Sequence, residues 1–180
     1  MIYTEKTKKA MKLCFEAHKD QVDKSGMPYV FHPFHVAEQM TDEVTTIVAL
    51  LHDVVEDTEY TLEDIAAMGF GQDVVAALAL MTHDKSVPYL DYVAKIKDNP
   101  IARAVKLADL AHNSDTTRLD VIEKKDKERL DKYKAAIAIL DLSVQHISMD
   151  LSYHNPTRPI SELSPEERWE RCYEFGWHDE

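Results

Sequence analysis

One stretch, residues 43–57, constrains the fold more than any other part of the sequence. Its middle is an almost continuous run of Val, Ile, Ala and Leu, which is typical of a helix buried in the centre of a domain. The same stretch carries His52 and Asp53 side by side, with Glu56 and Asp57 within the next turn. Such charge is costly to bury unless it is paired or bound to a metal ion. The sequence therefore predicts a central helix that carries a polar site.

The remaining apolar residues also recur mostly at helical spacing. The chain has only four glycines, which argues against Rossmann and P-loop enzymes, because both use glycines in phosphate-binding turns. No segment shows the alternation of a strand, so the predicted fold class is all-α. Beyond the central stretch, we expect helices at residues 4–19, after Pro33, at 61–69, 72–82, 88–98, 99–113 and 126–147, and a short one beginning at Ser164.

The length of 180 residues suits one domain with a C-terminal appendage. We assign residues 1–150 to the domain, and residues 151–180 to a polar linker followed by a short aromatic helix. The aromatic side chains of this helix, such as Trp169 and Trp177, are expected to pack on the domain or on a sister subunit. A homo-oligomer is therefore one expectation from the sequence.

The net charge of −12 predicts that nucleic acid polymers are not bound, because their phosphates would be repelled. A small anionic ligand is still compatible with this charge, since a metal ion and a few lysines can invert the local potential. The two cysteines, Cys14 and Cys172, lie far apart in the sequence and suit reduced thiols. Neither a membrane span nor a signal-peptide core is recognisable, so a cytoplasmic location is expected.

His52 and Asp53 need partners from other parts of the chain, because one helix cannot close a metal site. The candidates are His32, which precedes Pro33 at a helix start, and Asp109, which lies in an apolar helix. Imidazole nitrogens and carboxylate oxygens together suit Mn²⁺, Zn²⁺ or Fe, and four protein ligands leave room for water and substrate. The alternative is a partly buried cluster of ion pairs that holds no metal.

Three motifs occur in an order and spacing that resemble the hydrolase domain of the RelA/SpoT family, whose members are HD-domain metal-dependent phosphohydrolases. These motifs are YVFHP at residues 29–33, LLHDVVEDT at residues 50–58, and VKLAD at residues 105–109 with His112 and Asn113. The similarity covers about residues 5–140. It implies an HD-domain helical bundle with a short C-terminal extension. It also implies an enzyme that removes the 3′-diphosphate from ppGpp and pppGpp, with Mn²⁺ or another divalent ion as cofactor.

The resemblance further implies a role for each matching side chain. Glu56 and Asp57 would orient and activate water and exchange protons near the scissile phosphate of a small phosphorylated nucleotide. His18 and His112 would support metal ligands through hydrogen bonds. The metal ligands would be His32, His52, Asp53 and Asp109, and the substrate would contact Lys24, Ser25, Asn113 and Thr116.

The chain departs from the family pattern at three arginine positions. Asp23 stands where an arginine usually packs on the guanine base, and Leu110 and Asp115 replace two others. Exchanging arginine for aspartate replaces attraction by repulsion. Two alternatives to alarmone hydrolysis are therefore hydrolysis of a different phosphorylated nucleotide and a non-catalytic nucleotide sensor on the same fold. The length leaves no room for the synthetase domain of the family, so any activity is expected to be hydrolytic.

Other polar residues are expected to have structural roles. We assign His35 to surface or packing contacts and His83 to the surface. The charged run at residues 124–129 is expected to be the solvated face of a helix.

Overall fold

The structure is a computed structural model that describes residues 1–118 and 122–141. The chain divides into two units, Met1–Asp141 and Leu142–Glu180, and the described residues all belong to the first. The expected linker and aromatic helix, residues 151–180, lie outside the described residues, so this assignment stays a prediction.

The described residues form helices joined by short loops, which confirms the all-α prediction. The β-structure among the described residues is an isolated antiparallel bridge between Val22 and Pro28. No helix in this part of the chain has the length and apolar character needed to cross a bilayer. The helices are α1 (Glu5–His18), α2 (Phe31–Glu38), α3 (Glu43–Asp57), α4 (Leu62–Ala67), α5 (Gln72–Met81), α6 (Tyr89–Ile96), α7 (Pro100–Ser114), the 3-10 turn η1 (Thr116–Arg118) and α8 (Lys124–Leu140).

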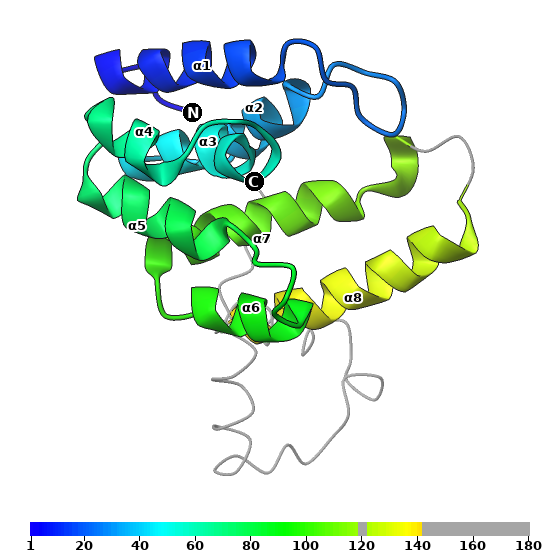
Figure 1. Ribbon diagram of the computed structural model, residues 1–180. Helices are drawn as coiled ribbons and strands as arrows, with labels where there is room; N and C mark the ends of the chain where they lie inside the picture. The colour runs from blue at the N-terminus through cyan, green and yellow to red at the C-terminus, as the bar shows by residue number, and fades with distance from the viewer. Residues whose placement is uncertain (119–121, 142–180) are drawn as a thin grey trace, which may run out of the picture. The chain divides into compact units, whose positions relative to one another are not determined.

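Helix α3 lies at the centre of the first unit, as its apolar sequence predicts. It contacts α1, α2, α5 and α7, and Figure 1 shows α1 on one side of it and α5 and α7 on the other. Leu50, Leu51 and Val54 have no exposed surface. Helices α6 and α8 contact each other, and α8 also packs on α7. The C-terminal turns of α3 are therefore surrounded by other helices, which can bring further side chains to His52 and Asp53.

Side-chain caps explain why two helices begin where the sequence predicts. Thr61 accepts a hydrogen bond from the backbone N–H of Asp64 at 3.2 Å, which caps α4. Asn99 accepts one from the backbone N–H of Ala102 at 2.9 Å, and Pro100 occupies the first position of α7. The cap at Asn99 fixes the start of α7, the helix that carries Asp109.

The boundaries of α2 and α8 differ from the predicted ones for identifiable reasons. Helix α2 begins at Phe31, so residues 32–33 lie inside its first turn, where proline is tolerated because its missing N–H has no intrahelical partner. Helix α8 begins at Lys124, slightly earlier than predicted, because a capping box closes its first turn. It ends at Leu140, and residues 142–147 of the predicted helix lie outside the described residues.

Replacing Leu50 by Ala should lower the free energy of unfolding by about 2–5 kcal/mol. Leu50 is fully buried in the middle of α3, so its truncation removes packing contacts and leaves a cavity. Urea denaturation followed by circular dichroism measures the change. Leu90→Ala is the control, because Leu90 is 38% exposed on α6; we expect its loss to be below about 1 kcal/mol. Equal losses in the two variants would contradict a core centred on α3.

Candidate functional site

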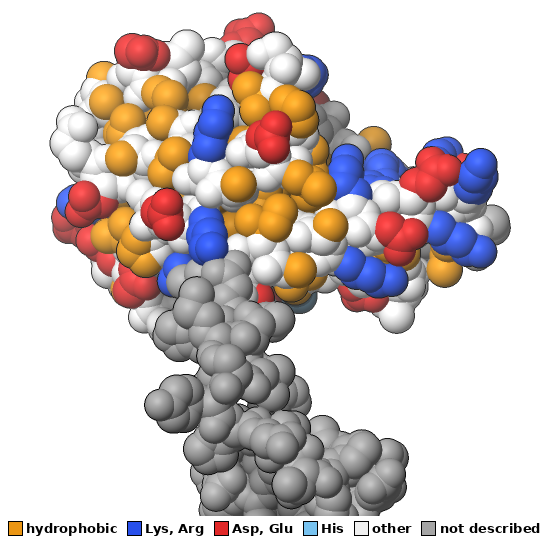
Figure 2. Space-filling view, turned by 90° about the horizontal axis from the view of Figure 1, so that it is seen from below, with side chains coloured by type: hydrophobic (Ala, Val, Ile, Leu, Met, Phe, Trp, Pro, Cys, Tyr) orange, Lys and Arg blue, Asp and Glu red, His pale blue; other side chains and the backbone are white. Residues whose placement is uncertain are grey.

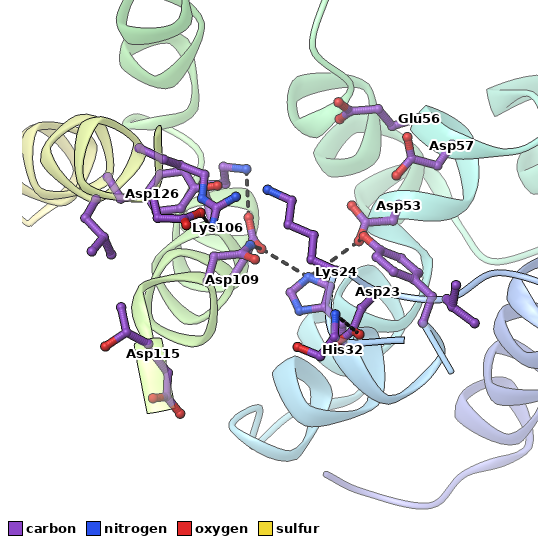
Figure 3. A pocket seen from close by; sticks show the side chains of 18 residues that line it. Asp23, Lys24, His32, Asp53, Glu56, Asp57, Lys106, Asp109, Asp115 and Asp126 are labelled. Atoms are coloured by element: carbon purple, nitrogen blue, oxygen red, sulfur yellow. Dashed lines mark hydrogen bonds and ion pairs between the residues drawn. The ribbon is translucent and has the colours of Figure 1, made fainter. Parts of the chain in front are cut away.

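Side chains from three helices meet at the C-terminal end of α3. His52 and Asp53 belong to α3, His32 lies in the first turn of α2, and Asp109 comes from α7. His32 Nε2 lies 3.2 Å from Asp109 Oδ1 and 3.5 Å from Asp53 Oδ2. His52 Nε2 lies 3.2 Å from the same Asp53 oxygen. The structure thus brings together the four residues predicted as metal ligands, and Figure 3 shows His32 between the two aspartates.

The ring of His52 is arranged to offer a lone pair to a cation. Its Nδ1 lies 2.7 Å from the backbone carbonyl oxygen of Ala49, which can only accept, so Nδ1 carries the proton. In the neutral ring Nε2 then bears a lone pair, and this atom is buried without a hydrogen-bond partner. One atom each from His32, His52 and Asp109 lie within 4.8 Å of one another. Imidazole lone pairs that face carboxylate oxygens fit a divalent cation, so these residues could hold one.

Asp109 is buried and receives hydrogen bonds from its own helix. Lys106 donates to its Oδ2 at 2.7 Å, and Asn113 donates to its Oδ1. Burial alone would raise the pKa of Asp109, but the Lys106 ammonium and His32 outweigh it and hold this pKa below its usual range. Burial likewise acts to lower the pKa of Lys106, and the Asp109 carboxylate raises it above its usual value. Asp109 therefore stays ionised and can bind a cation.

Tyr29 and His112 support this cluster from outside. Tyr29 donates its hydroxyl to Asp53 Oδ2 at 2.7 Å, and burial together with the charge of Asp53 raises the pKa of Tyr29, so that the hydroxyl keeps its proton. His112 Nδ1 lies 2.6 Å from His32 Nδ1, as the resemblance implies for this residue. The exposed ring of His35 stacks on His112 with centroids 4.3 Å apart, which agrees with the predicted packing role. These contacts orient His32 and Asp53.

His18 does not form a hydrogen bond with a predicted metal ligand, in contrast to the expectation from the sequence. It is fully buried, and its Nδ1 lies 2.8 Å from Gln21 Oε1. Gln21 in turn donates from Nε2 to the backbone carbonyl of Asp57 at 3.2 Å. His18 therefore supports Asp57, the last residue of α3, through Gln21. It positions the end of this helix and not a predicted metal ligand.

Glu56 and Asp57 lie at the rim of the site, on the same side as Asp53 (Figure 3). Partial desolvation and the Asp53 charge raise the pKa of both carboxyl groups. A raised pKa brings a carboxyl group closer to the pH at which it can exchange protons during a reaction. His83, predicted at the surface, is instead half-buried against the ring of Tyr92, and its backbone N–H lies 3.5 Å from Glu56 Oε2.

The cluster opens into a cleft of about 390 Å³, a size that suits a small-molecule ligand. Figure 3 shows the side chain of Lys24 pointing into this cleft from the loop before α2. The residues predicted to contact substrate all line the cleft: Lys24, Ser25, Asn113 and Thr116.

Several cleft residues were not predicted as site residues. Lys106, Arg129 and Tyr133 line the cleft, and Asp126 is only 5% exposed and lies 3.1 Å from Arg129. The solvated-face prediction for residues 124–129 is therefore wrong for Asp126 and Arg129, although the lysines there are exposed and Figure 2 shows charges of both signs along α8. A usable signal was the capping-box position of Asp126, three residues before Arg129.

The three departures from the family pattern have different surroundings. Leu110 is buried in the core and does not line the cleft. Asp115 lines the cleft and accepts hydrogen bonds from the backbone and hydroxyl of Thr117 at 2.9 and 2.7 Å. Asp23 also lines the cleft, and its carboxylate accepts hydrogen bonds from backbone amides of its own loop. Only the two aspartates can therefore affect a ligand directly.

Comparisons with known proteins identify an HD-domain family model and relatives named as guanosine-3′,5′-bis(diphosphate) 3′-pyrophosphohydrolases. A family model described as HD domain matches residues 10–95. The chain is 31% identical over 159 residues to the guanosine-3′,5′-bis(diphosphate) 3′-pyrophosphohydrolase MESH1 of Xenopus tropicalis, a match that covers 75% of this chain and 88% of that protein. It is 39% identical over 114 residues to MESH1 of Mus musculus, covering 55% of this chain and 63% of that protein.

A solved structure of a metazoan orthologue of SpoT, which hydrolyses ppGpp and plays a role in starvation responses, has a similar fold. The TM-score is 0.63 at 26% identity, and the match covers 78% of this chain and 88% of that one. The chain spans less than two thirds of several curated relatives that it matches, with 63% of mouse MESH1 and 16% of a GTP pyrophosphokinase of Streptomyces coelicolor.

Proposed function

This chain belongs to the HD-domain family that includes MESH1 and the hydrolase domains of SpoT and RelA, and we propose that it hydrolyses guanosine tetra- and pentaphosphate. Water would attack the phosphorus attached to O3′, the bond between O3′ and phosphorus would break, and pyrophosphate and GDP or GTP would leave. The observation that supports this most is the buried Nε2 of His52, which has no hydrogen-bond partner and lies 3.2 Å from Asp53, a residue that lines the cleft together with His32.

In this proposal the metal ligands are His32, His52, Asp53 and Asp109. We propose Mn²⁺ as the ion, because mixed imidazole and carboxylate ligands suit it, and another divalent ion with the same preference would serve. A bound ion would acidify water and neutralise charge that develops on the phosphoryl oxygens.

The protein's own residues would prepare the reaction. Glu56 and Asp57 lie at the rim beside Asp53, where one carboxylate can accept the proton of the attacking water and a carboxyl group can return a proton to O3′. Their raised pKa values favour this exchange. Lys24 and Lys106 line the same cleft and add positive charge near the phosphates. The acids would thus handle protons while the lysines hold the anionic ligand.

Incubation with ppGpp and Mn²⁺ should release pyrophosphate and GDP, and a chelator should stop the release until Mn²⁺ is restored. Nucleotide chromatography measures the products. The chelator should also lower the melting temperature, because an ion at 100 times its Kd stabilises the folded state by about 2.7 kcal/mol. If no pyrophosphate appears although Mn²⁺ raises the melting temperature, the substrate proposal fails and the metal site stands.

A different phosphorylated nucleotide is the second candidate substrate. It is favoured by Asp23 and Asp115, which line the cleft where the resemblance implies arginines. The same assay with a panel of 3′-phosphorylated nucleotides ranks the candidates by kcat/KM. Nucleotide binding without turnover at any divalent ion would instead support the sensor alternative.

We also propose a cytoplasmic location, a small nucleotide rather than a nucleic acid polymer as the partner, and self-association. The net charge of −12 supports the choice of partner. Cys14 is a free, buried thiol, and burial raises its pKa to about 12, which suits a structural cysteine in a reducing compartment. Sedimentation velocity of the full chain tests self-association.

A further inference from the structure

The loop that carries Lys24 is anchored to the site at its two ends. At its start, Gln21 donates to the backbone carbonyl of Asp57 at 3.2 Å, the last residue of α3. At its end, Tyr29 donates to Asp53 Oδ2 at 2.7 Å, and its backbone N–H bonds to the carbonyl of Gln21 at 2.9 Å. The base of the loop is therefore closed on the same helix that carries the candidate ligands and acids.

Between these anchors, the carboxylate of Asp23 closes the tip of the loop. Its Oδ1 accepts hydrogen bonds from the backbone N–H groups of Ser25 at 2.8 Å and Met27 at 3.0 Å. The backbone of Asp23 adds two more bonds, to the carbonyl of Met27 at 2.8 Å and from the N–H of Gly26 at 3.0 Å. Gly26 has φ +77°, a conformation that favours glycine in this turn. Lys24 thus lies in a turn that is closed by two side-chain and two backbone hydrogen bonds of Asp23.

We propose that Asp23 is a positioning residue that holds the loop of residues 22–28 so that Lys24 points into the cleft. In this proposal its carboxylate accepts hydrogen bonds from two loop amides, a role that differs from the repulsion of an anionic ligand that the sequence predicts. Only the kinetic consequences of this inference depend on the proposed function. An arginine at this position could not accept either hydrogen bond, because a guanidinium has no acceptor atom.

Three substitutions distinguish an Asp23 that positions the loop from an Asp23 that repels the ligand. Asp23→Asn keeps an oxygen that can accept both amides and removes the charge, so its KM for ppGpp should stay within about twofold of the parent value. Asp23→Ala and Asp23→Arg remove the acceptor, so KM should rise about tenfold while kcat changes little, since two loop hydrogen bonds are lost and the acids and candidate ligands are untouched. Restoring the arginine of the family pattern should therefore impair binding.

Amide hydrogen exchange tests the same inference without a ligand. In Asp23→Ala and Asp23→Arg, the N–H groups of Ser25 and Met27 should exchange about tenfold faster than in the parent, and in Asp23→Asn they should stay protected. Asp84→Ala is the matched control. Asp84 accepts from the backbone N–H of Ser86 at 2.9 Å in the loop between α5 and α6, and it does not line the cleft, so KM should not change.

Either of two results would overturn the inference. One is a lower KM in both Asp23→Asn and Asp23→Arg, which is what repulsion of the ligand by the carboxylate predicts. The other is unchanged exchange of Ser25 and Met27 in Asp23→Ala, which would show that the carboxylate does not hold the turn. If the parent protein does not hydrolyse ppGpp at all, the proposed function fails, and the exchange rates still decide the role of Asp23.

Discussion

Asp53→Ala is expected to abolish turnover of ppGpp and binding of Mn²⁺ together. Asp53 Oδ2 lies 3.2 Å from His52 Nε2 and 3.5 Å from His32 Nε2, so the substitution removes the carboxylate that joins the two imidazoles. Loss of a residue that only supports a ligand typically weakens metal affinity by about 10–100-fold, so loss of a proposed ligand should exceed about 100-fold. Isothermal titration with Mn²⁺ and the pyrophosphate assay measure the two effects.

Helical content should survive this substitution, because alanine has the highest helix propensity and Asp53 is replaced within a long helix. Asp73→Ala is the control, since Asp73 is exposed in the first turn of α5 and should change neither property. Turnover and Mn²⁺ affinity at the parent level in Asp53→Ala would falsify the proposed metal site. A circular dichroism spectrum of each variant excludes loss of the fold as the cause.

Glu56→Gln is expected to lower kcat by about 10²–10⁴-fold, the usual contribution of general acid–base catalysis. The amide has nearly the same shape as the carboxylate but cannot take up a proton at the reacting oxygen. Glu56 lies one turn beyond His52 and at the rim of the cleft, so Mn²⁺ affinity should stay within about threefold of the parent value. Stopped assays at saturating ppGpp measure kcat, and isothermal titration measures the affinity.

Because kcat and Mn²⁺ affinity are measured separately, they test whether Glu56 transfers protons or binds the metal ion. Glu63→Gln is the matched control, because Glu63 is exposed in the first turn of α4, and its kcat should equal that of the parent. A parallel loss of Mn²⁺ affinity and kcat in Glu56→Gln would place this residue among the metal ligands instead. An unchanged kcat would assign the proton transfer to Asp57.

Most of the helical architecture could be predicted because its signals are local. The apolar period of residues 43–57 and the caps at Thr61 and Asn99 depend on neighbours within one or two turns, and these helices begin at the predicted places. Helix α8 was misplaced at its start because the capping box at Glu123 was not recognised. Boundaries depend on such single contacts, whereas the existence of a helix depends on its whole apolar face.

Part of the site could not be predicted, because it depends on which side chains face each other. Lys106 belongs to a recognised motif, but its ion pair with Asp109 and its place in the cleft follow from the packing of α7 on α3. The capping-box position of Asp126 was a local signal, but the burial of Asp126 and its ion pair with Arg129 follow from the contact between α8 and α7. Asp23 lines the cleft, but the hydrogen bonds that its carboxylate accepts from two loop amides could not be predicted from the sequence.

From residue order alone, one learns that the chain is helical, that its central helix is buried, and that this helix carries a histidine and an aspartate able to bind a cation. These properties follow from propensities and periodicities that act over a few residues. Tertiary packing decides that one atom each of His32, His52 and Asp109 lie within 4.8 Å of one another, that His52 Nε2 is left without a hydrogen-bond partner, and that Lys106 keeps Asp109 charged. Distances between residues far apart in a chain arise only when apolar faces pack together, because burial of those faces and not local preference determines which helices become neighbours.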